Sequence, residues 1–411
     1  MNAFGKAQPN NSFERSADSA AFIRQLERLF SSLRARSIRA LGGFFGLTVG
    51  NMNKTRLLIS PIIVLLLTQN SFGQSPIVDG FINSYVKANN FSGTILIQKD
   101  SKLSYAKSFG LANRQLKVPN RIDTKYKIAS ITKALTAVLI LRLHEQGRID
   151  LNKTIKAYLP NYTGEGADKV TVHQLLNHTS GMANIDRNLT SAESAIKKGI
   201  PHYQTPLTTD DLLAKYCSEK LVNQPGRAFD YNNADYIILG KIIERIHGKT
   251  YEQVLKENIS QPLAMRDSGM LYQHNVVENL ADTYFFRDDL KTLVNDLPVY
   301  IENWYAAGAM YSTANDVLRF SNALFGSKLL KQDTLALMLK PGLDDYGYGV
   351  WIYESKFSNK KHTIVKRPGR IMGAQSMLFH VLNEDTTIVI LSNTDATSLD
   401  EFAAEISKRI L

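Results

Sequence analysis

The sequence predicts a mixed α/β fold of the α+β type: one antiparallel sheet built from both ends of the mature chain, flanked by helices, with an inserted, mostly helical lobe. Two observations predict it. β-rich or alternating patterns occur near both ends of the chain, at 92–98, 103–109, 347–353, 362–367, 374–381 and 386–392. Between them, residues 150–320 show mostly helical spacing and loops. A single sheet that joins both sets of strands is the most economical way to bury their apolar faces.

The composition is that of a globular protein whose basic charge is concentrated at one end. The chain has 411 residues, of which 44% are hydrophobic and 21% charged, and its formal net charge is +11. Residues 1–73 hold nine of the 49 basic residues but only three of the 38 acidic ones, so the rest of the chain has a mild excess. Because no basic stripe with interleaved aromatic residues is present, we expect no nucleic-acid partner.

Residues 52–73 have the layout of a secretory signal peptide. Lys54 and Arg56 precede an apolar run at 57–67, and small residues follow it. The run is shorter than the roughly 20 apolar residues that a membrane span needs. We therefore expect an exported protein, periplasmic or secreted, with no stable membrane span after cleavage. Residues 1–51 are then a mis-called start or a disordered extension.

The mature chain is expected to begin with a helix and a hairpin. Apolar residues at helical spacing predict a helix at 77–88, and the turn residues 99–102 join the first two β-rich runs into a hairpin. A strong helix follows at 131–147, where apolar residues recur at helical spacing and Gly147 ends the pattern.

The remaining elements complete two lobes. Further helices are expected at 210–220, 236–247, 251–259, 313–325 and 399–410. We divide residues 74–411 into an α/β lobe, at 74–130 and 330–411, and a helical lobe at 131–329. A cleft between two such lobes is a natural position for an active site.

The first candidate chemistry is a serine–lysine pair at the start of the helix at 131–147. Ser130 and Lys133 are three residues apart, so their side chains share one face of a helix. A serine hydroxyl becomes a good nucleophile when a base removes its proton, and a lysine can be that base if burial or nearby positive charge lowers its pKa. The helix N-terminus also suits an oxyanion near Ser130. An N-capping serine with a solvated lysine is the structural alternative.

A second candidate element is the Tyr-x-Asn pattern formed by Tyr231 and Asn233, in a loop before a predicted helix. A tyrosine beside a lysine can share proton transfers, and an asparagine side chain can hold a substrate amide or carboxyl. A loop turned by asparagines with a core tyrosine is the structural alternative.

The ordered pair Ser-x-x-Lys and Tyr-x-Asn resembles the serine β-lactamase and penicillin-binding-protein superfamily, specifically the class C β-lactamase branch with its esterase and D-amino-peptidase relatives. The family's third element is Lys or His, any residue, and Gly; here Arg367 and Gly369 occupy its ends. Phrases at 175–182, 261–265 and 307–316 also resemble the family. The resemblance implies that residues 74–411 are the catalytic domain.

The resemblance also implies a mechanism without a cofactor. Ser130 would attack a carbonyl and form an acyl-enzyme that water then hydrolyses. Lys133 and Tyr231 would share the role of base and proton relay, and which of them is the working base stays open. The backbone N–H groups of Ser130 and of Arg370 would form the oxyanion hole.

Arg367 is the informative departure from the family pattern. Its planar, permanently charged guanidinium can pair with a carboxylate, as in a peptide that ends in a free acid. The alternatives are that any cation suffices at this position, or that Arg367 points away from the substrate. Family members specialised for β-lactams usually keep a lysine here, so β-lactams rank behind peptides and small esters.

The histidines and the cysteine suggest no further chemistry. His173 and His178 are five residues apart, an indifferent spacing for helical zinc ligands, so we predict a structural loop and no metal. Cys217 is the single cysteine and reads as a small buried residue in a helix. The competing function is a non-catalytic peptidoglycan- or ligand-binding protein that retains the fold. The oligomeric state stays open.

Overall fold

The computed structural model describes residues 76–187 and 192–411, which fall in one compact unit that spans Asn70–Leu411. The predicted signal peptide at 52–73 and the extension at 1–51 lie outside the described residues. Within the described residues, no helix combines the length and the apolar character needed to cross a membrane.

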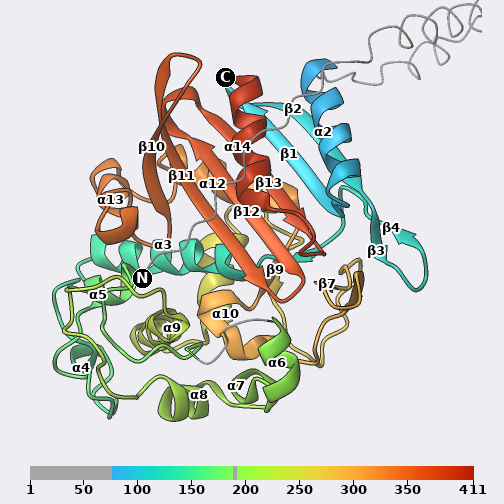
Figure 1. The fold of residues 1–411 in the computed structure, drawn as a ribbon. Helices are drawn as coiled ribbons and strands as arrows, with labels where there is room; N and C mark the ends of the chain where they lie inside the picture. The colour runs from blue at the N-terminus through green and yellow to red at the C-terminus, as the bar shows by residue number, and fades with distance from the viewer. Residues whose placement is uncertain (1–75, 188–191) are drawn as a thin grey trace, which may run out of the picture. The chain divides into compact units, whose positions relative to one another are not determined.

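The predicted antiparallel sheet is present and draws its strands from both ends of the unit. Its order is β10-β11-β12-β13-β1-β2, so two strands from early in the chain add to four from its end (Figure 1). The strands are β1 (Gly93–Lys99), β2 (Lys102–Phe109), β10 (Trp351–Phe357), β11 (Lys360–Ile371), β12 (Ala374–Val381) and β13 (Thr386–Ser392). The junction pairs β1 with β13, from Gly93 opposite Ser392 to Lys99 opposite Thr386. The fold class expected from the sequence is therefore confirmed.

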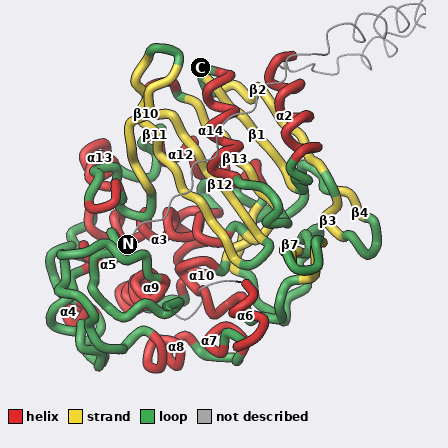
Figure 2. The backbone as a smooth tube through the Cα atoms, viewed as in Figure 1, coloured by secondary structure: helices red, strands yellow, loops and turns green. Residues whose placement is uncertain are grey.

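Both faces of the sheet are buried, which explains why its central strands are continuously apolar rather than alternating. In β13, Ile388 and Ile390 belong to one apolar cluster, whereas Val389 and Leu391 belong to another on the opposite face. The first cluster includes α2 (Pro76–Ala88) and α14 (Leu399–Ile410), which contact each other and cover one face of the sheet (Figures 1 and 2). Tyr85 and Phe402 stack there with ring centroids 4.2 Å apart.

The opposite face of the sheet packs on helices from the middle of the chain. Helix α12 (Ala314–Phe325) contacts β1 and β13, and its Asn322 exchanges two amide hydrogen bonds with Gln98 of β1 at 2.8 and 3.0 Å. Helix α3 (Thr132–Glu145) has 11 of its 14 residues buried, and a helix that is buried all round must lie at the centre of its lobe. It contacts α9 (Asn233–His247) and α11 (Tyr305–Gly308).

Shorter helices complete this region. They are α4 (Ile155–Tyr158), α5 (Val172–Leu176), α6 (Ala192–Lys198), α7 (Pro201–Gln204), α8 (Thr209–Tyr216), α10 (Tyr251–Leu255) and α13 (Gln332–Met338). Helix α9 begins at Asn233, three residues before the predicted start. Asn232 caps it there, because its side chain accepts a hydrogen bond from Ala234 N.

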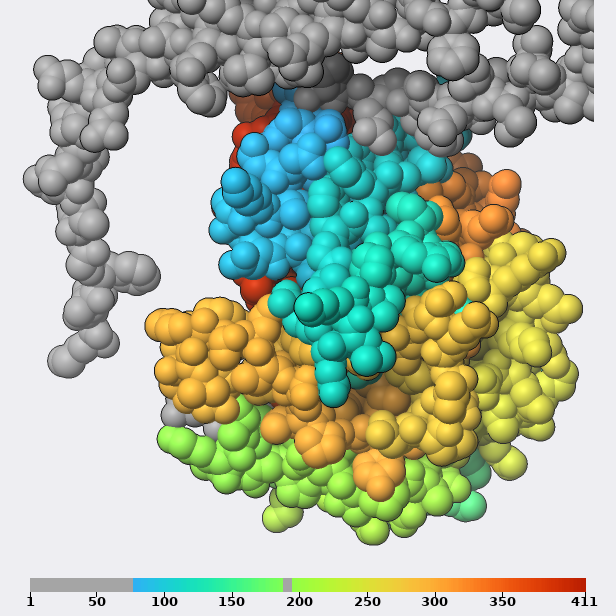
Figure 3. All heavy atoms as spheres, turned by 90° about the vertical axis from the view of Figure 1, so that its right-hand side faces the viewer, coloured from blue at the N-terminus to red at the C-terminus, as the bar shows by residue number. Residues whose placement is uncertain are grey.

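Several short strands were not predicted from the sequence, and four of them lie in the region 150–320 that was expected to be mostly helix and loop. They are β3 (Leu111–Asn113), β4 (Val118–Pro119), β5 (Tyr126–Lys127), β6 (Gly269–Met270), β7 (Tyr284–Arg287), β8 (Thr292–Asn295) and β9 (Met310–Ser312). The segment with β3 and β4 lies against residues further along the chain, since Ala112 O accepts from Asp282 N at 2.9 Å and Tyr284 Oη accepts from Arg114 N at 2.8 Å. Figure 3 shows this teal segment beside the yellow and orange ones.

Strand β10 begins at Trp351 and not at residue 347 as predicted. Gly347 N donates to Val350 O, and Gly349 has a φ of +79°, so the residues before Trp351 form a turn that a side chain at position 349 would strain. Tyr346, which directly precedes this turn, is fully buried, and its ring lies 4.6 Å from that of Trp351.

Candidate active site

Ser130 lies on a single 3₁₀ turn, Ala129–Ile131, between strand β5 and helix α3. The three-stranded sheet of β5, β9 and β6 anchors this turn, because Ile128 N donates to Met310 O at 3.0 Å. Ala129 has a φ of +46°, a left-handed conformation that is unfavourable for alanine and that often accompanies functional sites. Ser130 is half-buried, whereas both its neighbours are fully buried, so its side chain alone reaches the pocket.

Lys133 is fully buried and contacts the candidate nucleophile. Its Nζ donates to Ser130 Oγ at 3.2 Å, to Asn233 Oδ1 at 2.6 Å and to Ala307 O at 2.9 Å. These three acceptors match the three N–H bonds of an ammonium group. Burial, together with the Arg367 cation, lowers the pKa of Lys133 to about 8, although Tyr231 opposes the shift.

Tyr231 approaches the same serine from the loop before α9. Its hydroxyl donates to Ser130 Oγ at 2.9 Å, and its ring lies 4.8 Å from Lys133 Nζ and stacks on Trp351 at 5.8 Å. Burial acts to raise the pKa of Tyr231, but the Arg367 and Lys133 cations outweigh it and the pKa is lowered from its ordinary value. At a given pH, a larger fraction of this tyrosine than of one in water is therefore the phenolate, the form that can accept a proton.

Arg367 is 1% exposed, and its guanidinium donates hydrogen bonds to other groups of the protein. Its Nε donates to Ser130 O at 2.6 Å, Nη1 donates to Tyr346 Oη at 3.0 Å, and Nη2 donates to Tyr231 Oη. The guanidinium is therefore held between two phenols and the backbone carbonyl of the candidate nucleophile.

Asn233 joins Lys133 to a residue that the sequence analysis missed. Its Oδ1 accepts from Lys133, and its Nδ2 donates to Asp186 Oδ2 at 2.6 Å. Asp186 lies in the loop after α5, shortly after the Asn177-His178-Thr179-Ser180-Gly181 phrase. That proximity is the only sequence signal that could have singled it out.

Strand β11 forms one wall of the site. Strand β10 pairs with it only as far as Lys366, so residues 367–371 have no β10 partner. A Cβ on Gly369 would lie 2.8 Å from Ser130 N and 2.7 Å from Ile128 O, which is too close for any side chain. The Arg370 side chain is 64% exposed and forms an ion pair with Asp395 at 3.0 Å.

Two pockets meet at Ser130, and Tyr231, Arg370 and Asp395 also line both. The Asn233-side pocket has a volume of about 360 Å³ and is lined in addition by Asp186, Ala195, Ile200, Tyr203, Asn233, Phe285, Trp304, Ile371 and Met372. The Trp351-side pocket has about 530 Å³ and is lined in addition by Trp351, Arg367, Pro368, Gly369, Gln375, Ser376, Met377, Thr397, Ser398, Leu399 and Asp400. A substrate carbonyl at Ser130 would thus have room on either side.

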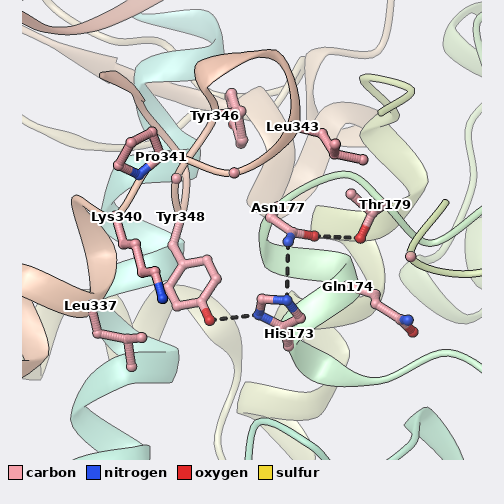
Figure 4. A pocket seen from close by; sticks show the side chains of 13 residues that line it. His173, Gln174, Asn177, Thr179, Leu337, Lys340, Pro341, Leu343, Tyr346 and Tyr348 are labelled. Atoms are coloured by element: carbon pink, nitrogen blue, oxygen red, sulfur yellow. Dashed lines mark hydrogen bonds between the residues drawn. The ribbon is translucent and has the colours of Figure 1, made fainter. Parts of the chain in front are cut away.

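The two histidines that the sequence analysis considered occupy different places. His178 is fully buried, with Nδ1 2.8 Å from Asp235 Oδ2 and its ring centroid 4.5 Å from that of Tyr231, so it packs behind the tyrosine. His173 lies in a separate pocket, where its ring nitrogens contact Tyr348 Oη at 2.6 Å and the Asn177 amide at 3.2 Å (Figure 4). Among the described residues, no three His, Cys, Asp or Glu side chains gather in a way that would hold a metal ion.

The structure thus brings Ser130, Lys133, Tyr231, Asn233, Arg367 and Gly369 together from three distant parts of the chain. The Arg370 side chain is turned to Asp395, so only its backbone remains as a candidate donor for the site. Cys217 is buried and lies on the C-terminal side of α8, where burial raises the pKa of its thiol.

Comparisons with known proteins identify the family and the fold. The chain matches the Beta-lactamase family over residues 78–409. It is 29% identical over 319 residues to the putative penicillin-binding protein PbpX of Bacillus subtilis, covering 76% of this chain and 73% of that protein. A penicillin-binding protein from Bacillus halodurans superposes with a TM-score of 0.66 at 26% identity, over 79% of this chain and 98% of that one. A D-stereospecific amidohydrolase from Streptomyces sp. gives 0.68 at 23% identity, over 80% and 96%.

Proposed function

The chain belongs to the beta-lactamase family, a family of hydrolases, and from that premise we propose that it is a serine acyl hydrolase in which Ser130 forms an acyl-enzyme with an amide or ester substrate. One observation carries the proposal: Ser130 Oγ lies 3.2 Å from Lys133 Nζ and 2.9 Å from Tyr231 Oη, at the meeting point of two pockets. A nucleophile within hydrogen-bond reach of its base is the signature of covalent catalysis.

In the proposed mechanism, Tyr231 takes the proton and Lys133 stays charged. Lys133 has a pKa of about 8 and three acceptors around Nζ, which suits an ammonium at neutral pH. Tyr231 has a lowered pKa, so its phenolate can accept the Ser130 proton while Oγ bonds to the substrate carbonyl carbon. The proton then goes to the leaving nitrogen or oxygen as its bond to carbon breaks. In the second half-reaction a water molecule gives a proton to Tyr231 as its oxygen bonds to the acyl carbon. The bond from that carbon to Ser130 Oγ then breaks, the acid is released, and Tyr231 returns the proton to Oγ.

The oxyanion would be stabilised by backbone donors. The candidates are the N–H groups of Ser130 and Arg370, because the absence of a side chain on Gly369 lets β11 approach within van der Waals distance of the Ser130 backbone. Two backbone donors aimed at a developing oxyanion contribute a large part of the rate acceleration in acyl transfer.

We assign Arg367 to the tuning of Tyr231 and not to the recognition of a substrate carboxylate, because its guanidinium is buried and already bonded to Tyr231, Tyr346 and Ser130 O. The activity should then rise with pH along a limb set by the ionisation of Tyr231, whose phenolate is the base, while Lys133 remains protonated. Removing the Arg367 cation raises the pKa of both groups, so the Arg367→Gln variant should shift that limb upward by about one pH unit or more. The Arg367→Lys variant keeps the charge and should leave the limb nearly in place. The measurement is kcat/KM against pH for all three proteins.

A different result would identify the alternative role. If Arg367 bound a substrate carboxylate, the Gln variant would raise KM for acid-terminated peptides over their amidated counterparts while the pH limb stayed fixed. Equal shifts in the Lys and Gln variants would show that the charge of Arg367 is not what matters.

The proposed substrates are amides and esters, including D-amino-acid or peptidoglycan-type peptides, with β-lactams ranked last because Arg367 replaces the lysine of β-lactam specialists. The test is a panel of these substrates, run with a fluorescent fluorophosphonate that labels reactive serines. Stoichiometric labelling with turnover of an ester or amide supports the hydrolase. Binding of peptidoglycan fragments with neither labelling nor turnover would favour the non-catalytic binding protein.

We also propose that the protein acts outside the cytoplasm, on the basis of the basic residues and the apolar run at 57–67. Cleavage should occur after Gly73. N-terminal sequencing of the protein from its native host should begin at Gln74, and a sequence that began upstream of Met52 would contradict the proposal.

A further inference from the structure

One carboxylate of the site has no part in the proposed mechanism. Asp186 lines the Asn233-side pocket together with Ser130 and is partly exposed to it. Its Oδ2 accepts from Asn233 Nδ2 at 2.6 Å, its Oδ1 lies 3.3 Å from His202 Nε2, and its negative charge raises the pKa of the Tyr203 phenol beside it, an effect second only to that of burial. A negative charge on the wall of the pocket that contains the candidate nucleophile favours substrates with a complementary charge.

The charge of Asp186 is not balanced by a lysine or an arginine among the residues whose side chains the structure describes. Its one basic neighbour there is His202, whose Nε2 lies 3.3 Å from Oδ1 and carries a charge only when the imidazole is protonated, and its contacts to Asn233 and Tyr203 are to neutral groups. Lys133 is separated from it by the Asn233 amide. Asp395, the other carboxylate of this pocket, differs because Arg370 pairs with it at 3.0 Å. Asp186 is therefore the carboxylate that remains available to a cationic ligand.

The remaining walls of the pocket are mostly apolar. Tyr203 and Trp304 stack with centroids 3.5 Å apart, and Phe285, Ile200 and Met372 add further apolar surface. Ile200 comes from the α6–α7 segment and Phe285 from β7, which Figure 1 shows near each other. An apolar pocket with one well-placed charged group orients its ligand through that group. This one suits a ligand with a cationic nitrogen next to an apolar side chain.

We propose that Asp186 is a specificity-determining residue that binds the α-ammonium group of an aminoacyl substrate. The preferred substrates are then amides or esters of amino acids, or peptides with a free N-terminus, whose apolar side chain fills the Asn233-side pocket. Asn233 links Lys133, which contacts Ser130, to Asp186, and Ser130 and Asp186 line the same pocket, so the proposal places a group two bonds from the attacked carbonyl carbon beside the carboxylate. The inference rests on the proposed serine hydrolase function.

The experiment compares p-nitroanilides of three acids that differ only at the α-position: phenylalanine, used in both D and L forms, N-acetylphenylalanine and 3-phenylpropionic acid. The wild-type protein should prefer the free-amino substrate. The Asp186→Asn variant, which keeps an oxygen acceptor for Asn233, should lose about 10- to 100-fold in kcat/KM on that substrate, chiefly through KM, and little on the two neutral ones. Asp168→Asn is the matched control, because Asp168 is an exposed carboxylate paired only with Lys156.

Each other outcome overturns a distinct part of the account. Equal losses on charged and neutral substrates would mean that Asp186 only positions Asn233. A wild-type preference for the neutral substrates, or a lack of turnover of all of them by a protein whose Ser130 still reacts with a fluorophosphonate, would refute ammonium recognition and leave the hydrolase in place. Failure of Ser130 to react at all would refute the proposed function itself.

Discussion

Replacement of Ser130 by alanine is expected to abolish turnover, with a loss of at least about 10⁴-fold in kcat. The substitution removes the only oxygen that both Lys133 Nζ and Tyr231 Oη contact, at 3.2 and 2.9 Å. A water molecule cannot replace the hydroxyl as nucleophile efficiently, because nothing holds it in the fixed position that Ser130 Oγ has at the start of α3. The measurement is steady-state hydrolysis of the best substrate from the panel.

The fold should survive this change, which makes the result interpretable. Lys133 keeps Asn233 Oδ1 and Ala307 O as acceptors, and Tyr231 keeps its contact with Arg367. The melting temperature should therefore stay within about 3 °C of the wild type. An alanine variant with this stability and more than a tenth of wild-type activity would remove Ser130 from the mechanism.

Replacement of Lys133 by methionine should lower kcat/KM by about 10³-fold. Methionine fills a similar volume but lacks the cation that lowers the pKa of Tyr231 and that holds Ser130 Oγ. The remaining activity should rise towards higher pH, because Tyr231 then requires a more alkaline solution to ionise. Kinetics at several pH values test both parts of the prediction.

The thermal stability of the Lys133→Met variant should not fall with its activity, and at neutral pH it should equal or exceed that of the wild type. Lys133 is fully buried among neutral acceptors, and its lowered pKa means that the native state disfavours its charged form. Below pH 8, where both native and unfolded lysine are protonated, the wild type bears this penalty in full; the penalty fades as the pH rises from about 8 towards 10.5. The Met variant should thus melt at or above the wild-type temperature at pH 7. A much less stable variant with unchanged kinetics would instead assign Lys133 a structural role.

Local patterns in the sequence were sufficient to predict the strands of the main sheet and part of the candidate site. Strands β12 and β13 and helix α14 have the predicted bounds, because apolar runs between turn residues and a capped amphipathic helix are local signals. The approach of Ser130 and Lys133 followed from their spacing on a helix. The prediction that Tyr231 and Gly369 lie beside them depended on the family resemblance, since no local pattern links positions a hundred or more residues apart.

What the sequence could not predict depends on long-range packing. From the sequence, Arg367 could pair with a substrate carboxylate, serve only as a cation or point away from the substrate. The contacts of its guanidinium with Tyr346 and Tyr231 depend on packing between segments more than a hundred and about twenty residues away, which no local pattern predicts. Asp186 carries no motif, and only the fold places it against Asn233. Strands of two to four residues, such as β5 and β9, are too short for a periodic pattern and form because neighbouring segments pair with them.

The central claim is that Ser130 carries the acyl group. The most direct measurement is intact mass and peptide mapping of the protein quenched in acid during turnover of a slow ester or a β-lactam. The account predicts a single adduct with the mass of the acyl group on the peptide that contains Ser130, and none in the Ser130→Ala variant. An adduct on another residue, or steady turnover with no adduct under conditions where hydrolysis of the acyl-enzyme is rate-limiting, would contradict it.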